Sequence, residues 1–262
     1  MATEAVARPA ATILLLRDGP NGLEVFMVVR HHAIDFASGA LVFPGGRVET
    51  SDCALAERLG AADAHAGGFQ IAAIRETFEE CGVLLARKNG NSAIVDADIL
   101  LRVENEHRAA LNAGSIEFGA IMDAHELAPA TDLLVHYAHW ITPANQPKRY
   151  DTQFYLAEAP AAHVAVHDGY ESVDSIWITP QDALTGTEEG RYVLVFATQM
   201  NLKKLAQFAT VADAMAATRA STVVTVQPRG TKLDDKRRKL LIPIEAGYGG
   251  SEFIVDLPPA SS

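Results

Sequence analysis

The chain has 262 residues, of which 48% are hydrophobic and 21% charged, an ordinary composition for a globular protein with a sizeable core. Its 22 basic and 33 acidic side chains give a net charge of −11, which argues against binding to the phosphate backbone of a nucleic-acid polymer. No apolar run is long enough to span a membrane, residues 1–9 lack the features of a signal peptide, and two cysteines suggest no disulfide scaffold, so we expect a cytoplasmic protein.

The N-terminal region is predicted to be β structure. Residues 11–16 and 23–29 have the apolar character of strands, and they flank Asp-Gly-Pro-Asn-Gly, a strong turn signal. Residues 42–46, Val-Phe-Pro-Gly-Gly, then predict a strand that runs into a turn. Because Gly45 and Gly46 have no side chains, their backbone groups can approach a ligand or a metal closely.

The next strong feature is a helix that gathers acidic side chains. At 3.6 residues per turn, Glu76, Glu79 and Glu80 project from one face of this helix. The opposite face is apolar and carries Ile71, Ile74 and Phe78. Arg75 can pair with only one or two of the glutamates, whereas a hard cation such as Mg²⁺ would relieve their repulsion. The acidic face is therefore a candidate divalent-metal site, with a solvated surface as the plain alternative.

The segments around this helix show clear periodicities. Before it, residues 54–59 predict a short helix and an Ala- and Gly-rich stretch with His65 predicts a loop, while Gly82 can cap the helix C-terminus. Downstream we predict strands at residues 84–85, 133–141, 149–156, 172–178 and 222–226, and helices at residues 96–111, 116–127, 179–184, 201–208 and 211–218.

Two other features carry chemistry-bearing side chains without a site pattern. The basic segment at residues 232–239 is interrupted by two aspartates, so we expect a solvated turn and not a phosphate-binding patch. The histidines, including His136 and His139, have no metal-ligand spacing to a partner, and we expect them to be structural or exposed.

At the acidic helix the sequence resembles the Nudix hydrolase family. The family signature is a glycine, five residues, a glutamate, seven residues, and then Arg-Glu-hydrophobic-x-Glu-Glu-x-Gly-hydrophobic. Residues 75–83 match the second half, with Thr77 at a usually hydrophobic position. The first half fits with Gly46 as the leading glycine and Asp52 in place of the glutamate. Because 22 residues separate Asp52 from Arg75, an insertion of 15 residues lies inside the motif.

An insertion at this point resembles the branch of the family that includes acyl-CoA diphosphatases. Residues 43–46, 140–143 and 147–155 point the same way, although the coenzyme A subgroup often has an arginine where Asp35 stands. Residues 84–127 contain no Pro, Tyr or Trp, so the markers of the ADP-ribose, dinucleoside polyphosphate and NADH subgroups are missing. The resemblance therefore favours coenzyme A or an acyl-CoA as the substrate.

The resemblance also implies an architecture. We expect an α/β protein with a Nudix-type α-β-α sandwich and a mixed sheet. A single domain would cover residues 1–262, with the family core at about residues 10–185. A helical insertion at about residues 95–130 would lie beside the site, and a C-terminal extension would occupy about residues 190–262.

The chemistry that the resemblance implies is hydrolysis of a diphosphate linkage with Mg²⁺ or Mn²⁺. A CoA substrate would yield 3′,5′-ADP and an (acyl-)phosphopantetheine. Glu79 and Glu80 would be the central metal ligands, Glu76 a ligand or the general base, and the Gly45 carbonyl a further ligand. Arg75 would orient the glutamates.

Three further residues are candidates for the site. Gly46 would contact the substrate, and Arg149 could meet a substrate phosphate, although an ion pair of Arg149 with Asp151 is the structural alternative. Glu171 stands where the family often places another acidic residue, which would serve as ligand or base.

Other functions stay open at this stage. The protein could hydrolyse ADP-ribose or an NADH-type substrate, or it could be a non-catalytic ligand-binding module of the same fold. The intact carboxylates Glu76, Glu79 and Glu80 argue against the binding module, and the P-loop and dinucleotide-binding fingerprints of other nucleotide folds are missing. We expect a small-molecule diphosphate as partner, no membrane contact, and leave a homodimer open.

Overall fold

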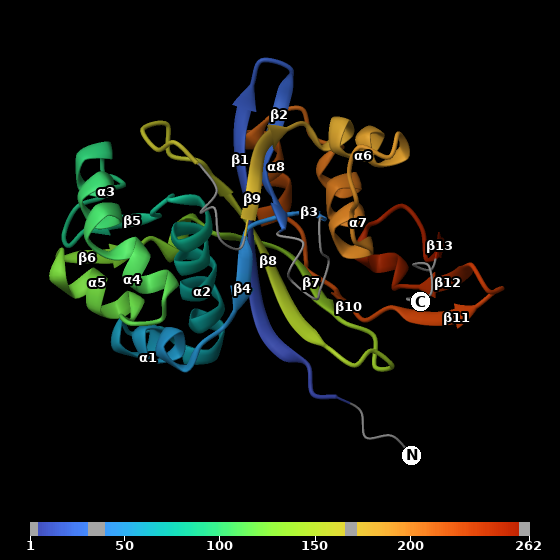
Figure 1. Cartoon of the computed structure of the whole chain (residues 1–262), viewed down its shortest axis with the longest axis horizontal. Helices are drawn as coiled ribbons and strands as arrows, with labels where there is room; N and C mark the ends of the chain where they lie inside the picture. Colours follow the sequence, from blue (N-terminus) through green and yellow to red (C-terminus); the bar gives the residue numbers. More distant parts are fainter. Residues whose placement is uncertain (1–4, 31–39, 166–171, 257–262) are drawn as a thin grey trace.

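The computed structural model describes residues 5–30, 40–165 and 172–256, and its centre is a mixed sheet of eight strands (Figure 1). These strands are β1 (Arg8–Gly19), β2 (Gly22–Arg30), β3 (Leu41–Val42), β4 (Gly45–Arg47), β7 (Val135–Ile141), β8 (Tyr150–Glu158), β9 (Ser172–Ile178) and β10 (Thr225–Val226). The predicted N-terminal hairpin and the later strands are confirmed, with ends that differ by a few residues.

The sheet runs in the order β10-β7-β8-β1-β2-β3, with β4 paired to β1 and β9 paired to β2. β1 is parallel to β8, and β7 is parallel to β10, whereas the other pairs are antiparallel. On the side opposite β8, β1 pairs with β4 through residues 10–12 and with β2 through residues 16–19. This division of one long strand between two partners leaves β4 beside α2 (Ala64–Cys81).

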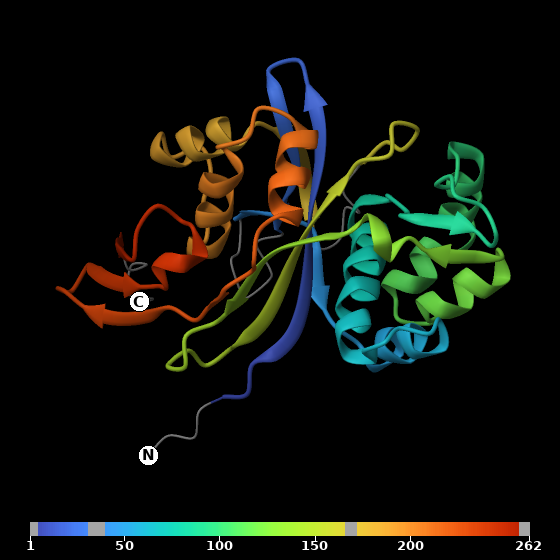
Figure 2. The same cartoon turned by 180° about the vertical axis from the view of Figure 1, so that it is seen from behind.

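Helices cover both faces of the sheet, so the predicted α-β-α sandwich with a mixed sheet is confirmed (Figures 1 and 2). One face carries α1 (Thr50–Arg58), α2 (Ala64–Cys81), α3 (Ala97–Val103), the π-helix η1 (Glu104–Arg108), α4 (Ala109–Asn112), α5 (Phe118–Ala124), the strand pair β5 (Ala86–Lys88) and β6 (Leu127–Pro129), and the 3₁₀-helix η2 (Thr131–Leu133). The other face carries α6 (Pro180–Glu188), α7 (Phe196–Leu205) and α8 (Val211–Arg219).

The two faces have separate hydrophobic cores because successive strand residues point to opposite sides. In β1, Ile13 and Leu15 pack towards α2, whereas Leu14 and Leu16 pack towards the side of α7 and α8. All four side chains are fully buried. Burial on both faces explains why this strand reads as a continuous apolar run in the sequence.

The C-terminal region forms a small separate sheet that is attached to the second core. It contains β11 (Arg229–Lys232), β12 (Arg237–Leu241), the 3₁₀-helix η3 (Ile244–Ala246) and β13 (Glu252–Asp256). The indole of Trp140 donates to the Tyr248 hydroxyl, which in turn donates to the side chain of Asn201, at 2.9 and 2.8 Å. These buried bonds join the segment before β13 to β7 and α7. The boundaries of domain, insertion and extension stay predictions.

The Ala- and Gly-rich stretch before the acidic helix, predicted as a loop, is helical. α2 begins at Ala64, and the Asp63 carboxylate caps it by accepting from the backbone N–H groups of His65 and Ala66. Gly68 allows α1 to approach closely, because a Cβ there would lie 2.5 Å from the sulfur of Cys53. The prediction was wrong because close packing of two helices, and not a turn, requires the small residue.

Other differences lie at segment ends, in the insertion and in the C-terminal region, where the strands β11, β12 and β13 were not predicted. Residues 84–85 precede β5 and are not part of it, and Leu127 begins β6 where a helix end was predicted. The predicted helix at residues 96–111 is divided into α3, η1 and α4 by the π turn. Within the three described ranges, no helix combines the length and apolar character that crossing a bilayer requires.

Candidate functional site

The predicted acidic residues lie where α2 packs beside β4 (Figure 1). The apolar face of the helix faces the core as predicted: Ile71, Ile74 and Phe78 are at most 1% exposed. The acidic face is not a solvated surface, because the Glu79 side chain is 17% exposed and Glu80 is 6% exposed. Carboxylates held this far from water need a nearby positive group or cation.

The two glycines of β4 lie directly against the glutamates. The backbone N–H of Gly45 donates to Oε2 of Glu80 at 3.0 Å. The Glu76 carboxylate lies over Gly46 so closely that a Cβ at this position would collide with it. Gly46 thus leaves the space that the Glu76 carboxylate occupies, and Gly45 holds the Glu80 carboxylate in place.

The carbonyl of Gly45 points towards the same side as its N–H. The backbone N–H of Ile13 donates to the Pro44 carbonyl, so the neighbouring pair of Thr12 and Gly45 is one of the non-hydrogen-bonded pairs of this antiparallel ladder. In such a pair the N–H and C=O groups point away from the partner strand. The geometry is therefore compatible with the Gly45 carbonyl as a metal ligand.

Arg75 is the positive centre of the cluster and is 3% exposed. Its Nη1 donates to Glu76 at 3.0 Å and to Glu79 at 3.2 Å, and its Nη2 donates to the carbonyl of Arg47 at 2.8 Å. Its Nε and Nη2 also form two parallel bonds of 3.0 Å to Asp52. These contacts leave the guanidinium surrounded by protein groups, which fits an orienting role better than a contact to substrate.

Asp52 lies under the cluster as the partner of Arg75, and it is 1% exposed. It belongs to the first turn of α1, where it also accepts the backbone N–H of Glu49 at 2.8 Å and completes a capping box. The shortened carboxylate of the signature thus joins α1 to α2, 23 positions apart in the sequence.

The pKa of the Glu79 carboxyl shows how strongly burial and neighbouring negative charge act in this cluster. Burial and the neighbouring charge of Glu76 raise the pKa of the Glu79 carboxyl to about 8, although Arg75 opposes this shift. A divalent cation between the glutamates would favour the ionised form and reverse the shift. The oxygens of Glu76 and Glu79 meet at Nη1 of Arg75, and that of Glu80 lies at the N–H of Gly45. Carboxylate oxygens suit a hard cation such as Mg²⁺ or Mn²⁺, and a bound ion would draw the three side chains closer together.

The helical insertion contacts the C-terminal end of this helix. Gly82 caps α2 in the left-handed conformation, with φ of 67°, as predicted. From the insertion, Nε of Arg108 donates to the carbonyl of Glu79 at 3.0 Å, and Nδ2 of Asn112 reaches the same oxygen at 3.5 Å. The insertion therefore supports the backbone of a site residue.

A row of polar side chains on β8 and β7 continues the site away from the helix. Ala11 of β1 pairs with Gly46 on one side and with Gln153 on the other, so Gln153 lies two strands from Gly46, a distance of about 10 Å. Nε2 of His136 lies 2.6 Å from the amide oxygen of Gln153, and Nε2 of His139 lies 2.5 Å from the Asp151 carboxylate. Neither histidine belongs to a site motif in the sequence. The register of β7 against β8 brings each of them to its partner.

The predicted candidate Arg149 is held apart from this cluster. Arg149 is buried, and its guanidinium donates to the carbonyls of Thr142 and Ala5 at 3.1 and 2.7 Å. Asp151 contacts His139 and not Arg149, so the predicted ion pair between Arg149 and Asp151 was wrong. Arg149 stands just before β8, and its guanidinium turns to the two backbone carbonyls and not to the strand. Glu171 and the marker position Asp35 lie outside the described residues.

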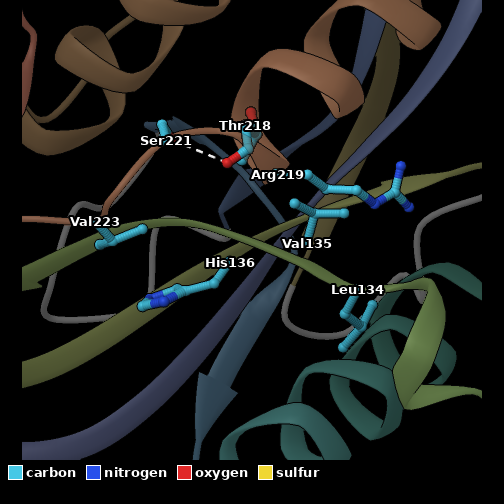
Figure 3. A pocket seen from close by; sticks show the side chains of 7 residues that line it. All are labelled: Leu134, Val135, His136, Thr218, Arg219, Ser221 and Val223. Carbon is cyan, nitrogen blue, oxygen red and sulfur yellow. Dashed lines mark hydrogen bonds between the residues drawn. The ribbon is translucent and has the colours of Figure 1, made fainter.

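A groove of about 410 Å³ opens at the start of β7 and does not reach the glutamates (Figure 3). It lies between β7 and the end of α8, and its lining residues are Leu134, Val135, His136, Thr218, Arg219, Ser221 and Val223. His136 belongs to both the groove and the polar row. The groove therefore adjoins the polar row at His136.

Comparisons with known proteins point to one family. The sequence model of the family described as NUDT19 Nudix domain matches residues 56–200. A Caenorhabditis elegans protein provisionally named nudix hydrolase 7 is 30% identical over 203 residues, which are 76% of this chain and 61% of that protein. The acyl-coenzyme A diphosphatase NUDT19 of Gallus gallus is 27% identical over 214 residues, 63% of this chain and 56% of the relative.

A solved structure is similar over most of its length. The crystal structure of a NUDIX hydrolase from Alicyclobacillus acidocaldarius superposes with a TM-score of 0.71 at 30% identity, covering 81% of this chain and 96% of that one. This chain spans only 56 to 61% of the length of the two curated relatives.

Proposed function

Because this chain belongs to the Nudix hydrolase family, we propose that it catalyses the metal-dependent hydrolysis of a diphosphate linkage in a nucleoside diphosphate derivative, with coenzyme A or an acyl-CoA as the substrate. The observation that carries this proposal is the largely buried group of Glu76, Glu79 and Glu80, of which the first two pair with Arg75. No ordinary surface helix would withdraw three carboxylates from water.

In the proposed site, Glu79 and Glu80 hold Mg²⁺ or Mn²⁺, and the Gly45 carbonyl is a further ligand. When bound, the cation polarises the diphosphate oxygens and lowers the pKa of a water molecule. The Gly45 N–H keeps the Glu80 carboxylate in one orientation, and Arg75 does the same for Glu76 and Glu79. Glu76 is the described residue placed to act as a further ligand or as the general base.

The substrate part of the proposal rests on relatives and on the adjoining surface. Two relatives, from Gallus gallus and Xenopus laevis, are named acyl-coenzyme A diphosphatase. From Gly46, which lies against the glutamates, Gln153 is about 10 Å away across the sheet, and His136 and His139 follow on the next strand, a direction in which the rest of a nucleotide could extend. Attack of water on the anhydride of CoA would release 3′,5′-ADP and a phosphopantetheine, or its acyl derivative from an acyl-CoA.

The test is a panel of CoA, acyl-CoA, ADP-ribose, NADH and dinucleoside polyphosphates, each with Mg²⁺, with Mn²⁺ and with EDTA. We expect cation-dependent release of 3′,5′-ADP from CoA and its esters, read by chromatography of the products. Equal cleavage of ADP-ribose would overturn the substrate, and no cleavage of any compound would make a ligand-binding module the better interpretation.

A further inference from the structure

A second group of metal-ligating side chains lies in the helical insertion, away from the glutamates of α2. It consists of Glu106 and His107 on η1 and of His125 at the C-terminal end of α5. In Figure 1, η1 lies directly before the labelled helix α4, and His125 directly follows the labelled helix α5. One potential ligand atom from each residue lies within 4.8 Å of the other two. Within the described ranges no other group of His, Cys, Asp and Glu comes together in this way.

We propose that Glu106, His107 and His125 form a binding site for a transition-metal ion, with Zn²⁺ as the expected occupant, that joins η1 to α5. The ligand set is two imidazoles and one carboxylate, with a fourth position left for water. This composition suits Zn²⁺ and related ions, whereas Mg²⁺ prefers an all-oxygen shell like that of the α2 glutamates.

The distances between the ligand atoms are close to those of a tetrahedral site. Oε2 of Glu106 lies 3.4 Å from Nε2 of His125 and 3.7 Å from Nε2 of His107. With bonds of about 2.0 to 2.1 Å, two ligands of a tetrahedral zinc ion lie about 3.3 Å apart. Only small side-chain shifts would therefore close the three atoms around an ion.

The buried nitrogen of His125 gives an independent indication. Its Nε2 is inaccessible to water and has no hydrogen-bond partner, because the contact to Glu106 lacks hydrogen-bond geometry. A buried polar atom without such a partner is destabilising, and this one points into a group of other metal ligands. A bound cation would satisfy it.

Backbone features of the insertion hold these ligands in place. Glu106 and His107 are neighbours on a π turn. Such turns are rare in proteins, and those that occur are often found at functional sites. Glu126, directly after His125, has φ of 55° and is the one described residue other than glycine with a positive φ. The rings of His107 and His125 lie in edge contact, with centroids 5.1 Å apart.

The proposed ion would also affect the α2 site through the backbone. Arg108 follows His107 on the same π turn and donates to the carbonyl of Glu79. A metal that holds η1 against α5 would limit the movement of this turn, and with it the movement of the support under Glu79. We therefore assign the site a structural role, separate from hydrolysis.

The test uses the full chain, freed of metal and then titrated with Co²⁺ in the presence of excess Mg²⁺, which occupies the glutamates. We expect one equivalent of Co²⁺ to give the visible absorption of a tetrahedral site, and Zn²⁺ to displace it. Zn²⁺ should also raise the melting temperature more than Mg²⁺ does, because a ligand that binds only the folded state stabilises it.

Variants then identify the ligands. His107→Gln and His125→Gln should each weaken Co²⁺ binding by about 10- to 100-fold or more, since changing a residue that only hydrogen-bonds to a metal ligand already reaches that range. His65→Gln, an exposed histidine on α2, is the matched control and should leave the titration unchanged. If His125→Gln fails to fold, the half-exposed Glu106→Gln replaces it.

Two results would overturn the proposal. The first is the absence of the visible bands in the wild-type chain at every Co²⁺ concentration, which would leave only an ionic contact between the histidines and Glu106. The second is a titration that His107→Gln and Glu106→Gln do not change. A titration lost in Glu80→Gln but kept in His107→Gln would assign the bound cobalt to the α2 glutamates instead.

Discussion

Two regions of this protein use the same kinds of charged residue in opposite ways. Around α2, Asp52 and Arg75 are at most 3% exposed, and two parallel hydrogen bonds join the guanidinium to the carboxylate. This paired geometry fixes the orientation of both side chains. In the C-terminal sheet of β11, β12 and β13, Lys239 and Glu252 form an ion pair with side chains 35% and 60% exposed. Burial distinguishes the two, because only side chains withdrawn from water are held in one geometry with strong electrostatic coupling.

The sequence makes the exposed region look similar to a phosphate-binding patch. Its basic segment contains Lys232 and Arg237, but Asp235 and Asp234 neutralise them through contacts at 2.7 and 2.8 Å. These side chains are all exposed by more than two fifths, as expected for a solvated turn. A charge run is thus informative about function only when the fold removes it from solvent.

The largest expected difference between the two regions is in catalysis. Glu80→Gln keeps an oxygen that can accept the N–H of Gly45, but it removes one negative charge from the proposed metal site. We expect activity to fall by more than about 100-fold with the fold retained, since changing a residue that only hydrogen-bonds to a metal ligand already costs up to about 100-fold. Initial rates against Mg²⁺ concentration measure the loss, with melting temperature as the check on folding.

The matched control for that change is Glu252→Gln in β13, which removes the same charge at an exposed position. It should keep wild-type rates. Near-full activity in Glu80→Gln would remove the α2 glutamates from the mechanism.

The next difference is in stability. Arg75→Gln would leave the carboxylates of Asp52, Glu76 and Glu79 facing one another without their shared cation. We expect a loss of about 3 to 5 kcal/mol in the free energy of unfolding, the range found when one partner of a buried ion pair is removed. Urea unfolding measures it, and added Mg²⁺ should recover part of the loss by binding the same carboxylates.

Lys239→Gln provides the comparison from the exposed sheet. Removing the partner of Glu252 should change the free energy of unfolding by about 1 kcal/mol or less. Equal losses in Arg75→Gln and Lys239→Gln would contradict the distinction drawn between the two regions.

A smaller effect should follow from restoring the glutamate that the family signature usually has. Asp52→Glu lengthens a side chain that is 1% exposed and is held by both Arg75 and the N–H of Glu49. An added methylene in a filled interior is destabilising by about 1 to 3 kcal/mol. Urea unfolding tests this, and an increase in stability would show that the space around Asp52 is larger than its contacts suggest.

The smallest effect is expected inside α2 itself. The hydroxyl of Thr77 is fully buried and donates to the carbonyl of Ala73 at 2.7 Å, which explains how a polar residue occupies a usually hydrophobic position. Thr77→Val should leave activity unchanged and alter the free energy of unfolding by about 1 kcal/mol or less, because the Ala73 carbonyl keeps its helical bond. A large loss of activity would mean that this hydroxyl does more than satisfy a local bond.

The local parts of the site could be predicted from the sequence. The spacing of Glu76, Glu79 and Glu80 requires one helix face, and a left-handed cap at Gly82 follows from its place after the helix. The main local error, the loop predicted before α2, came from two glycines whose role is close contact with α1. A glycine in a sequence indicates missing side-chain volume, but it does not say whether a turn or a neighbouring helix needs the space.

The sequence by itself therefore determined the family, the class of fold and the acidic helix, since these depend on periodicity along a continuous segment. Only the tertiary structure decided the place of Asp52 beneath Arg75, the polar row of His136 and Gln153, and the meeting of His107 with His125. The physical reason is that helical spacing is a property of the local backbone, whereas contacts between distant residues depend on strand register and on how the cores pack.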